Sequence, residues 1–492
     1  MRFGSIAILA TVWFSVQSAH ASPFLAPGDA ALRRDIQFLA DTGVIKGTVS
    51  TWPLAWGPIL DDIRHFDSQG DVPLELLSVI TRVRDRGEWE TRVGSAQYKA
   101  RASLTSNPTR IRSFDNTPRE ESVLSGGVDW IGDRFSIDLN LTAVSSPSDG
   151  QEFRGDGSQI SAALGNWTIS ANTYERWWGP GWDGSLILSN NARPFPSLSI
   201  DRNFPLPFRS KWLRWLGPWD LSVMFGQLEA DRAVPNTHFF GMRFDFRPMP
   251  SLEIGLSRTA LWCGDGRPCD LGKFANLLIG NDNVSANNVG PSKEPGDQLA
   301  GLDFRWGIGS TTHRHAVYGQ FIGEDEAGGF PSRYLAQLGV DTSGFWSDDW
   351  SYQAFAELAL TNCGFRQTEQ FLNCAYNHNI YQTGYRYRGR TIGHGADNDS
   401  RILSAGLIVI DSKDRVWKAL LRYANLNRLG PPDPHNSLTP TQQDIASIDL
   451  MHRRQFRYGI LEFGLGYERI NDIASTRTEG DVRAFLSWKS AY

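Results

Sequence analysis

The alternation that decides the fold is clearest in residues 134–143, RFSIDLNLTA, and it recurs in residues 240–247, FGMRFDFR. In both segments every second residue is apolar, and the residues between are charged, polar or small. A period of two residues is typical of a β-strand with one apolar and one polar face. In a soluble β-sandwich the apolar face packs on a second sheet, whereas in an outer-membrane barrel it meets lipid and the polar face lines a wet lumen. The alternation alone allows both folds.

The lengths of the connections favour the barrel. Residues 105–118 and 145–157 form long connections, whereas 131–133 form a short one, and this alternation continues along the chain. Outer-membrane barrels have the same pattern, because their periplasmic turns are tight and their outer loops are long. Two connections fit poorly, since 176–183 is short for an outer loop and 203–218 is long for an inner turn. We therefore predict an all-β transmembrane barrel of about eighteen antiparallel strands with a small N-terminal α-helical subdomain.

Within a barrel domain at residues 91–492, the strands are predicted at 91–104, 119–130, 134–144, 158–164, 167–175, 184–202, 219–228, 238–247, 251–262, 297–306, 314–322, 332–341, 350–361, 400–411, 414–425, 444–453, 456–470 and 479–492.

Composition and charge exclude other classes of protein. The chain has 492 residues, a formal net charge of -5 at pH 7 and a mean hydropathy of -0.34. Beyond residue 21 no apolar run approaches the roughly 20 residues that a transmembrane helix needs, so a helical membrane protein is excluded. The charge shows no basic excess, and we expect no nucleic-acid partner.

The first 21 residues have the pattern of a secretory signal peptide. Arg2 precedes an apolar stretch from Ile6 to Val16, and Ala19-His20-Ala21 is a small-x-small cleavage site. We therefore predict that residues 1–21 direct export and are removed.

Four cysteines, at positions 263, 269, 363 and 374, are then exposed to an oxidising compartment. Four cysteines allow three disulfide connectivities. The local pairings, Cys263 with Cys269 and Cys363 with Cys374, are favoured because each closes a short loop within one Gly-, Asn- or Pro-rich stretch. A zinc site is the alternative, although neither spacing is Cys-x-x-Cys. We expect no metal and no cofactor.

Residues 22–90 have a helical period instead of a period of two. Asp29 is a suitable N-cap for a helix that Gly43 ends, Pro73 can open another helix, and residues 58–66 are a plausible third. We predict a periplasmic helical subdomain here. It could be free or packed against one end of the barrel, and periodicity does not distinguish the two.

Two segments resemble a known family. Residues 174–196, YERWWGPGWDGSLILSNNARPFP, closely resemble the signature of the Wzi family of capsule-assembly outer-membrane proteins, and residues 384–394, GYRYRGRTIGH, resemble a second segment of that family. The resemblance implies an eighteen-stranded barrel with a helical bundle on its periplasmic side. It also implies a lectin-like role, in which the barrel binds capsular polysaccharide and holds it at the cell surface. It does not imply which capsular or extracellular polysaccharide is bound.

The ends of the barrel suggest further partners. Val482, Ala484, Leu486 and Trp488 share a face with the terminal Tyr492, and a C-terminal aromatic residue on such a strand resembles the signal that the outer-membrane protein assembly machinery reads. Outer-membrane lipid is expected on the apolar face, and we expect a monomer.

The connection at residues 204–219 has its own composition. Trp212, Trp215 and Trp219 lie among Arg and Lys residues there, and such a segment is expected at the level of the inner headgroups. A surface helix of a soluble domain is the alternative.

Sugars are bound by aromatic faces that stack on their rings and by planar side chains that hydrogen-bond their hydroxyls, and acidic sugars also pair with guanidinium groups. Both family segments supply such residues, and the alternation in 386–390 would place three guanidiniums on one face of an extended segment. The predicted polysaccharide-binding residues are Glu175, Arg176, Trp177, Trp178, Trp182, Asp183, Tyr385, Arg386, Tyr387, Arg388 and Arg390.

Each prediction has a structural alternative. The tryptophans could form a membrane-interface girdle or an inward plug, and the arginines could line the lumen opposite acidic residues such as Glu357. Asp397 and Asp399 resemble half of a calcium loop, but the rest of that motif is missing and a turn is expected.

Two other functions are alternatives to polysaccharide binding. His394 or His435 could imitate part of a catalytic triad, but the sequence has no Gly-x-Ser-x-Gly elbow, and we expect no enzymatic activity. A passive porin or sugar channel is the other alternative, since an eighteen-stranded barrel can leave an aqueous bore. The helices and long loops favour occlusion of that bore.

Overall fold

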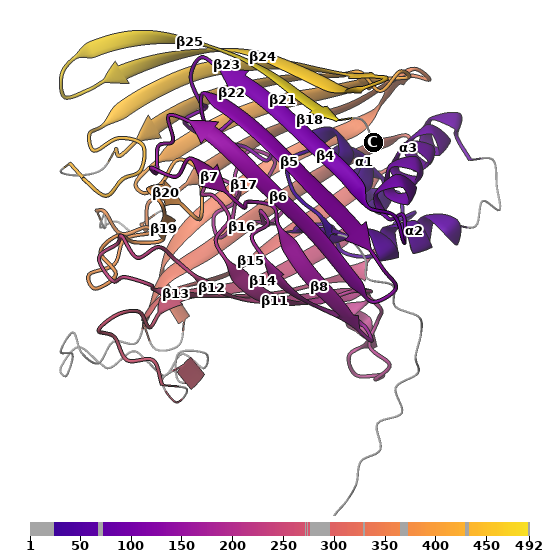
Figure 1. Cartoon of the computed structure of the whole chain (residues 1–492), viewed down its shortest axis with the longest axis horizontal. Helices are drawn as coiled ribbons and strands as arrows, with labels where there is room; N and C mark the ends of the chain where they lie inside the picture. Colours follow the sequence, from indigo (N-terminus) through magenta and orange to yellow (C-terminus); the bar gives the residue numbers. More distant parts are fainter. Residues whose placement is uncertain are drawn as a thin grey trace, which may run out of the picture.

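In the computed structural model the chain forms a closed antiparallel β-barrel (Figure 1). The structure describes residues 24–66, 72–270, 272, 274–275, 296–327, 330–364, 372–428 and 432–490. The predicted signal peptide at residues 1–21 and the terminal Tyr492 lie outside the described residues.

Eighteen strand positions make up the barrel in the described part of the chain. The short β7 (Phe153–Arg154) shares a position with β8, since both pair with β6. The strands are β4 (Gln97–Thr105), β5 (Ser122–Ile131), β6 (Phe135–Ser145), β8 (Gln159–Leu164), β9 (Trp167–Asn172), β11 (Ser197–Arg202), β12 (Trp219–Gln227), β13 (His238–Met249), β14 (Leu252–Trp262), β15 (Gly296–Gly309), β16 (His313–Ala327), β17 (Phe330–Ser347), β18 (Trp350–Leu360), β21 (Arg401–Asp411), β22 (Val416–Leu426), β23 (Gln443–Phe456), β24 (Gly459–Asp472) and β25 (Arg477–Ser490).

The prediction of an all-β barrel is confirmed, and the β-sandwich alternative is excluded. Each predicted strand overlaps an observed one, but several boundaries are wrong, and β16 and β17 extend beyond their predicted ends at residues 322 and 341. The first strand begins at Gln97 instead of residue 91, because residues 91–96 form a turn between helix α3 (Leu74–Glu90) and the strand. Residues 184–196, predicted as strand, fold into the lumen instead.

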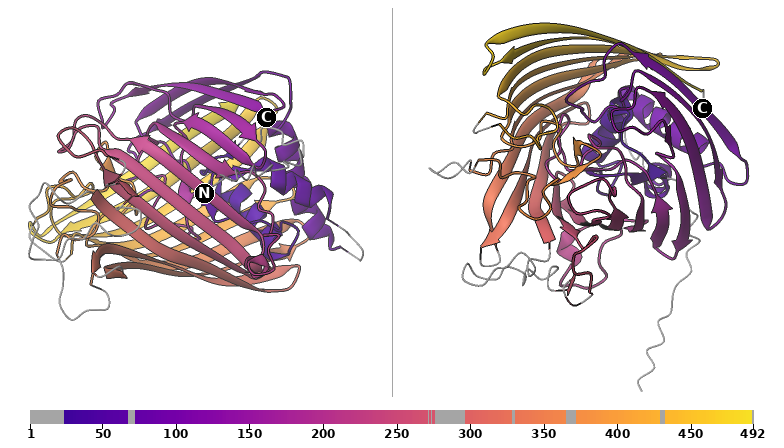
Figure 2. Two further views of the ribbon diagram at one scale, coloured as in Figure 1. Left: turned by 90° about the horizontal axis from the view of Figure 1, so that it is seen from below. Right: turned by 60° about the vertical axis from the view of Figure 1, so that its left-hand side comes forward.

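Each strand pairs with its neighbours in the sequence, and the barrel closes where β25 meets β4. Trp488 lies opposite Ala102 in this last pair. The two further views in Figure 2 show the closed wall and the chain that fills its interior.

The two faces of the wall follow the alternation in the sequence. Leu139 and Leu141 of β6 point outward and are 48% and 64% exposed, whereas Arg243 and Asp245 of β13 point into the lumen and are fully buried. The outer face is therefore the apolar, lipid-compatible one, and the charged face must find its partners inside.

Three helices occupy the end of the barrel where the short turns lie, and their positions match the prediction (Figure 1). They are α1 (Ala30–Asp41), α2 (Trp56–Arg64) and α3. Asp29 caps α1, because its side chain accepts the Leu32 N–H at 3.1 Å. All residues of α1 are buried, and α1 contacts β17 and β21, so this helix lies inside the barrel instead of beside it. None of the helices in the described ranges is long and apolar enough to cross a membrane.

Two connections from the opposite end also fold inward. The one between β9 and β11 carries β10 (Trp177–Trp178), which pairs with β2 (Thr51–Trp52), and β1 (Phe24–Leu25) pairs with β3 (Leu54–Ala55). The connection between β18 and β21 carries β19 (Arg386–Tyr387) and β20 (Arg390–Thr391). We call the three helices with residues 173–196 and 372–400 the plug. The connection that fitted poorly at 176–183 is in fact long, whereas 203–218 stays an exception.

The plug predicts that the barrel conducts poorly. Planar-bilayer recordings of the purified protein should show little current, although an empty barrel of this strand number leaves an aqueous channel. Deleting residues 22–90 should raise the current, provided that the variant keeps the heat-modifiable gel mobility of a folded barrel. A large, steady conductance in the intact protein would contradict occlusion and support a porin.

Candidate functional site

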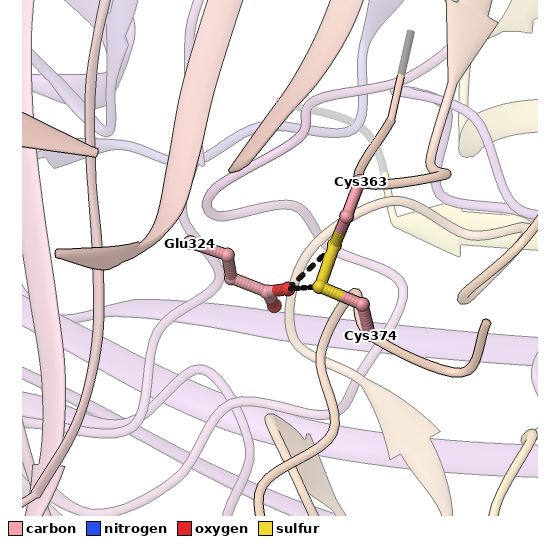
Figure 3. A group of neighbouring side chains, drawn as sticks. All are labelled: Glu324, Cys363 and Cys374. Atoms are coloured by element: carbon pink, nitrogen blue, oxygen red, sulfur yellow. Dashed lines mark hydrogen bonds between the residues drawn. A yellow bond between two sulfur atoms is a disulfide. The ribbon is translucent and has the colours of Figure 1, made fainter. Parts of the chain in front are cut away.

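Both favoured disulfides are present. Cys263 pairs with Cys269 and Cys363 with Cys374, with Cα–Cα distances of 4.7 and 6.0 Å. The Glu324 carboxylate of β16 lies 3.2 and 3.4 Å from the sulfurs of the second pair (Figure 3). Sulfurs joined to each other cannot act as thiolate ligands, so this group of three residues does not form the alternative zinc site.

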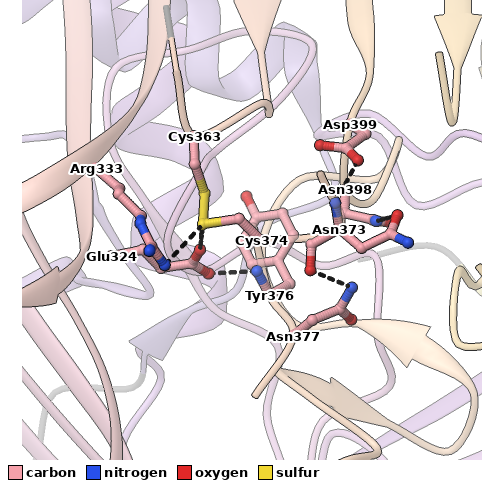
Figure 4. The surroundings of a disulfide bond; sticks show 9 residues. All are labelled: Glu324, Arg333, Cys363, Asn373, Cys374, Tyr376, Asn377, Asn398 and Asp399. Atoms are coloured by element: carbon pink, nitrogen blue, oxygen red, sulfur yellow. Dashed lines mark hydrogen bonds between the residues drawn. A yellow bond between two sulfur atoms is a disulfide. The ribbon is translucent and has the colours of Figure 1, made fainter. Parts of the chain in front are cut away.

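The second disulfide fixes the start of a plug segment to the wall. Tyr376 donates its backbone N–H to Glu324, and Asn373 donates its backbone N–H to Asp399 at 2.7 Å (Figure 4). Residues 372–377 are therefore held both by the wall and by residues further along the same connection.

The first family segment wraps around a buried carboxylate of the wall. Glu357 of β18 accepts the backbone N–H groups of Trp182 at 2.8 Å and Gly184 at 2.9 Å, and the Tyr318 hydroxyl at 3.0 Å. Gly184 is required there, because a Cβ would lie 2.1 Å from Nε2 of His394. Glu357 therefore holds the turn of the motif, and it does not face the arginines of the second segment as the alternative supposed.

The tryptophans of the motif lie inside the plug. Trp177 and Trp178 are fully buried and Trp182 is 3% exposed. Trp177 lies opposite Trp52 in the β10–β2 pair, and Trp182 donates Nε1–H to Asp341 at 3.2 Å. This burial favours the plug alternative over a glycan contact, and none of the three lies at a membrane interface.

Arg33 connects helix α1 to this motif. Its guanidinium lies 4.4 Å from the ring centroids of both Phe114 and Trp182, and Nη2 donates to the Pro180 carbonyl at 2.9 Å. A cation between aromatic faces in a dry site is strongly attracted to them. The helical end and the loop end of the plug are thus joined by one side chain.

The arginines of the second segment separate into two environments. Arg386 is buried and makes a bidentate pair with Asp397, with N···O distances of 2.6 and 2.9 Å. The prediction that three guanidiniums share one extended face is wrong, because the chain turns back at Arg388, whose φ is 48°, and β19 pairs with β20. Asp397 is therefore committed to Arg386 and not to a calcium site.

Arg388 and Arg390 line an open pocket at the loop end of the barrel, together with Tyr387. The pocket encloses about 330 Å³, part of it continuous with solvent. Its described lining residues are Arg112, Arg119, Glu120, Ser148, Asp149, Arg193, Tyr387, Arg388 and Arg390. Five guanidiniums thus face two carboxylates, and we call this the arginine pocket.

The carboxylates of the arginine pocket are already paired. Glu120 and Asp149 both bind Arg154, at 2.7 and 2.9 Å, and Asp149 also binds Arg193. Arg193 binds Asp156 as well, at 2.8 Å.

Three of the guanidiniums keep an uncompensated charge. Arg112, Arg388 and Arg390 have hydrogen bonds but no ion pair with any residue that the structure describes. Burial and the nearby Arg119 and Arg110 lower the pKa of Arg390 to about 10. The pocket therefore carries an excess of positive charge over the carboxylates that line it.

The other predicted site residues divide between the wall contacts and a neighbouring pocket. Asp183 pairs with Arg422 at 2.6 Å, and the Tyr385 hydroxyl donates to the Ile187 carbonyl at 2.8 Å, so both hold the plug in place. Glu175 and Arg176 line a second pocket that also includes Arg193.

Sequence reasoning missed Arg112, Arg119 and Arg193. Arg193 lies within the first family segment, and the other two lie in or next to the first predicted long connection. The available signal was the concentration of arginine in long connections at one end of the barrel. The sequence did not show which of these arginines would lack a carboxylate.

The family profile of the capsule assembly protein Wzi matches residues 91–481. The chain belongs to the Wzi family. The protein is therefore an outer-membrane β-barrel, as predicted.

Two relatives agree with this assignment. A protein of Klebsiella pneumoniae, described as an uncharacterised 55.8 kDa protein in the cps region, is 29% identical over 87% of this chain and 82% of its own length. The solved Wzi of Escherichia coli is 25% identical, with a TM-score of 0.82 over 96% of this chain and all of that chain. It is described as a carbohydrate-binding β-barrel involved in group 1 capsule assembly.

The buried His394 predicts an acid-sensitive plug. Burial lowers its pKa to about 4, and Nδ1 accepts the Ala396 N–H at 3.2 Å. The folded state therefore binds this proton less readily than the unfolded state, so the stability contributed by neutral His394 is present above about pH 6.5 and is lost as the pH falls toward 4.

The contribution of His394 is isolated by comparing the pH dependence of the free energy of unfolding in the wild type and in His394→Asn. Asn does not titrate but can still accept the hydrogen bond. Between pH 7 and pH 5 the free energy of unfolding of the wild type should fall by about 2 kcal/mol more than that of the variant. Protease cleavage within the plug would report the loss. Burial raises the pKa of Asp399 to about 6, which acts in the opposite direction in both proteins. An equal pH dependence in the two proteins would contradict the prediction.

Proposed function

We propose that this protein binds an acidic capsular or extracellular polysaccharide in the arginine pocket and helps to attach or assemble it at the cell surface. The observation that carries the proposal is the excess of guanidinium over carboxylate in this pocket, with Arg112, Arg388 and Arg390 lacking ion pairs in the described chain. The relatives support the same class of ligand, since Escherichia coli Wzi is described as carbohydrate-binding.

The chemistry of the arginine pocket fits such a ligand. A guanidinium can bind a uronate or pyruvate carboxylate through two parallel hydrogen bonds, and Arg388 and Arg390 are partly exposed and can be reached. Charge-assisted hydrogen bonds gain strength where water is partly excluded. Glu175, in the adjoining pocket, is bound to Arg119 at 2.8 Å and could accept sugar hydroxyls beside the acidic group.

The placement of the pocket fits a role at the cell surface. Tyr387 and Arg390 of the pocket belong to the hairpin of β19 and β20, which lies at the end of the barrel opposite the helices (Figure 1). In our proposal residues 1–21 direct export, the helices face the periplasm, and the assembly machinery inserts the barrel with this end outward. The bound polymer is held and is not cleaved.

Replacing both Arg388 and Arg390 by Ala should weaken retention of the polysaccharide. Each lost charged hydrogen bond should cost about 1 to 3 kcal/mol where it is desolvated. Lys at both positions should recover only part of the binding, because an ammonium keeps the charge but cannot make the two parallel hydrogen bonds of a guanidinium. The measurement is cell-bound uronic acid in a strain that lacks its own copy of the gene and carries each variant.

A double variant of Arg401 and Arg477 to Ala is the matched control, since both residues are exposed at the same end of the barrel and lie outside the arginine pocket. It should retain polysaccharide like the wild type. If the Arg388 and Arg390 variant folds, as judged by heat-modifiable mobility, and still retains wild-type amounts, the arginine pocket is not the binding site.

A further inference from the structure

The connection between β11 and β12, residues 203–218, differs from the other turns at the helical end of the barrel. The other turns at this end are no longer than residues 412–415. This connection carries the short 3-10 helix η1 (Arg214–Leu216) and stays outside the lumen, unlike the long connections of the plug.

The segment packs on the outer face of the wall. The Phe208 ring stacks on Trp219 with a centroid distance of 4.4 Å. The rings of Trp215 and Phe246 meet edge to face, with their centroids 6.2 Å apart. Trp219 and Phe246 belong to β12 and β13 and point away from the lumen, because Phe246 alternates with the inward Asp245 and pairs with Trp219. The segment therefore continues the apolar surface of the barrel that lipid covers.

The rest of the segment is exposed and combines large apolar residues with cations. Trp212 is 78% exposed and Trp215 64%. Arg209, Lys211 and Arg214 are also exposed, and residues 203–219 contain no Asp or Glu. None of the three cations has an ion pair within the ranges that the structure describes.

We propose that residues 203–218 form a binding site for an anionic glycerophospholipid, with the tryptophans at the level of the headgroups and the three cations on the phosphate. The proposal rests on continuity with the lipid-facing wall and on charge complementarity. Indole rings favour the boundary between hydrocarbon and water, and Lys and Arg beside them favour an anionic headgroup. A periplasmic leaflet supplies such lipids, and the plug and arginine pocket take no part.

Native mass spectrometry of the full-length protein in detergent tests this site. Phosphatidylglycerol should give stable adducts, and phosphatidylcholine should bind more weakly. A triple variant, Arg209→Gln, Lys211→Gln and Arg214→Gln, should bind phosphatidylglycerol about tenfold more weakly, with its phosphatidylcholine adducts unchanged. The matched control replaces Arg64, Arg84 and Arg92 by Gln, which removes the same charge from the helical region and should leave both lipids unaffected.

A second variant separates the aromatic contribution from the charge. Trp212→Ala with Trp215→Ala should lower the adducts of both lipids, because the rings do not recognise the headgroup charge. The proposal is overturned if the wild type binds both lipids equally or if the triple variant keeps its phosphatidylglycerol. It is also overturned if the triple variant loses crosslinks to a periplasmic protein while its lipid adducts stay unchanged. Polysaccharide retention should be normal in all these variants, so the outcome is independent of the arginine pocket.

Discussion

The organisation of this barrel depends on the contact of Arg33 with the first family segment. An eighteen-stranded wall encloses more space than its own side chains fill, so the chain must supply the filling. Arg33 enters from the helical end, and the Pro180 carbonyl and the Trp182 ring meet it from the loop end. Glu357 holds the same turn from the wall. A buried guanidinium is costly without partners, so removing the loop end of the plug would leave Arg33 buried without the Pro180 carbonyl and the Trp182 ring.

The fixed plug explains why the arginine pocket can exist. Arg386 is neutralised by Asp397 inside the plug, and this pair anchors the hairpin that carries Arg388 and Arg390 outward. The same residue type thus has two roles within five positions. A buried, fully bonded guanidinium positions the backbone, and two partly exposed guanidiniums keep a charge that the protein does not satisfy. A ligand can supply the missing carboxylates without disturbing the plug.

The sequence predicted well the strands and helices, whose residues repeat with a regular period. Alternation and connection lengths, together with the family resemblance, gave a predicted strand that overlaps each observed position, and Asp29 and Pro73 marked the starts of α1 and α3, because these signals are local. It failed where the outcome depends on distant partners. The alternation of Arg386, Arg388 and Arg390 suggested one shared face, yet a positive φ at Arg388 reverses the chain there. Trp177 and its neighbours have the composition of a sugar platform, but pairing with β2, some 125 residues away, buries them.

A long, specific motif can therefore be determined by the contacts that hold the plug in place more than by contacts with a ligand. Most side chains in residues 174–184 are consumed by contacts with the wall and with α1, and glycine is required at 184 by close approach to His394. Residues so constrained cannot be exchanged to suit a different glycan. Arg388 and Arg390 meet fewer constraints, since each guanidinium makes a single hydrogen bond in the described chain and faces an open pocket. Under the proposed function, selectivity among acidic polysaccharides can thus change at the rim while the plug and barrel stay the same. The glycan should accordingly be sought through the residues around the arginine pocket and not through the motif that identifies the family.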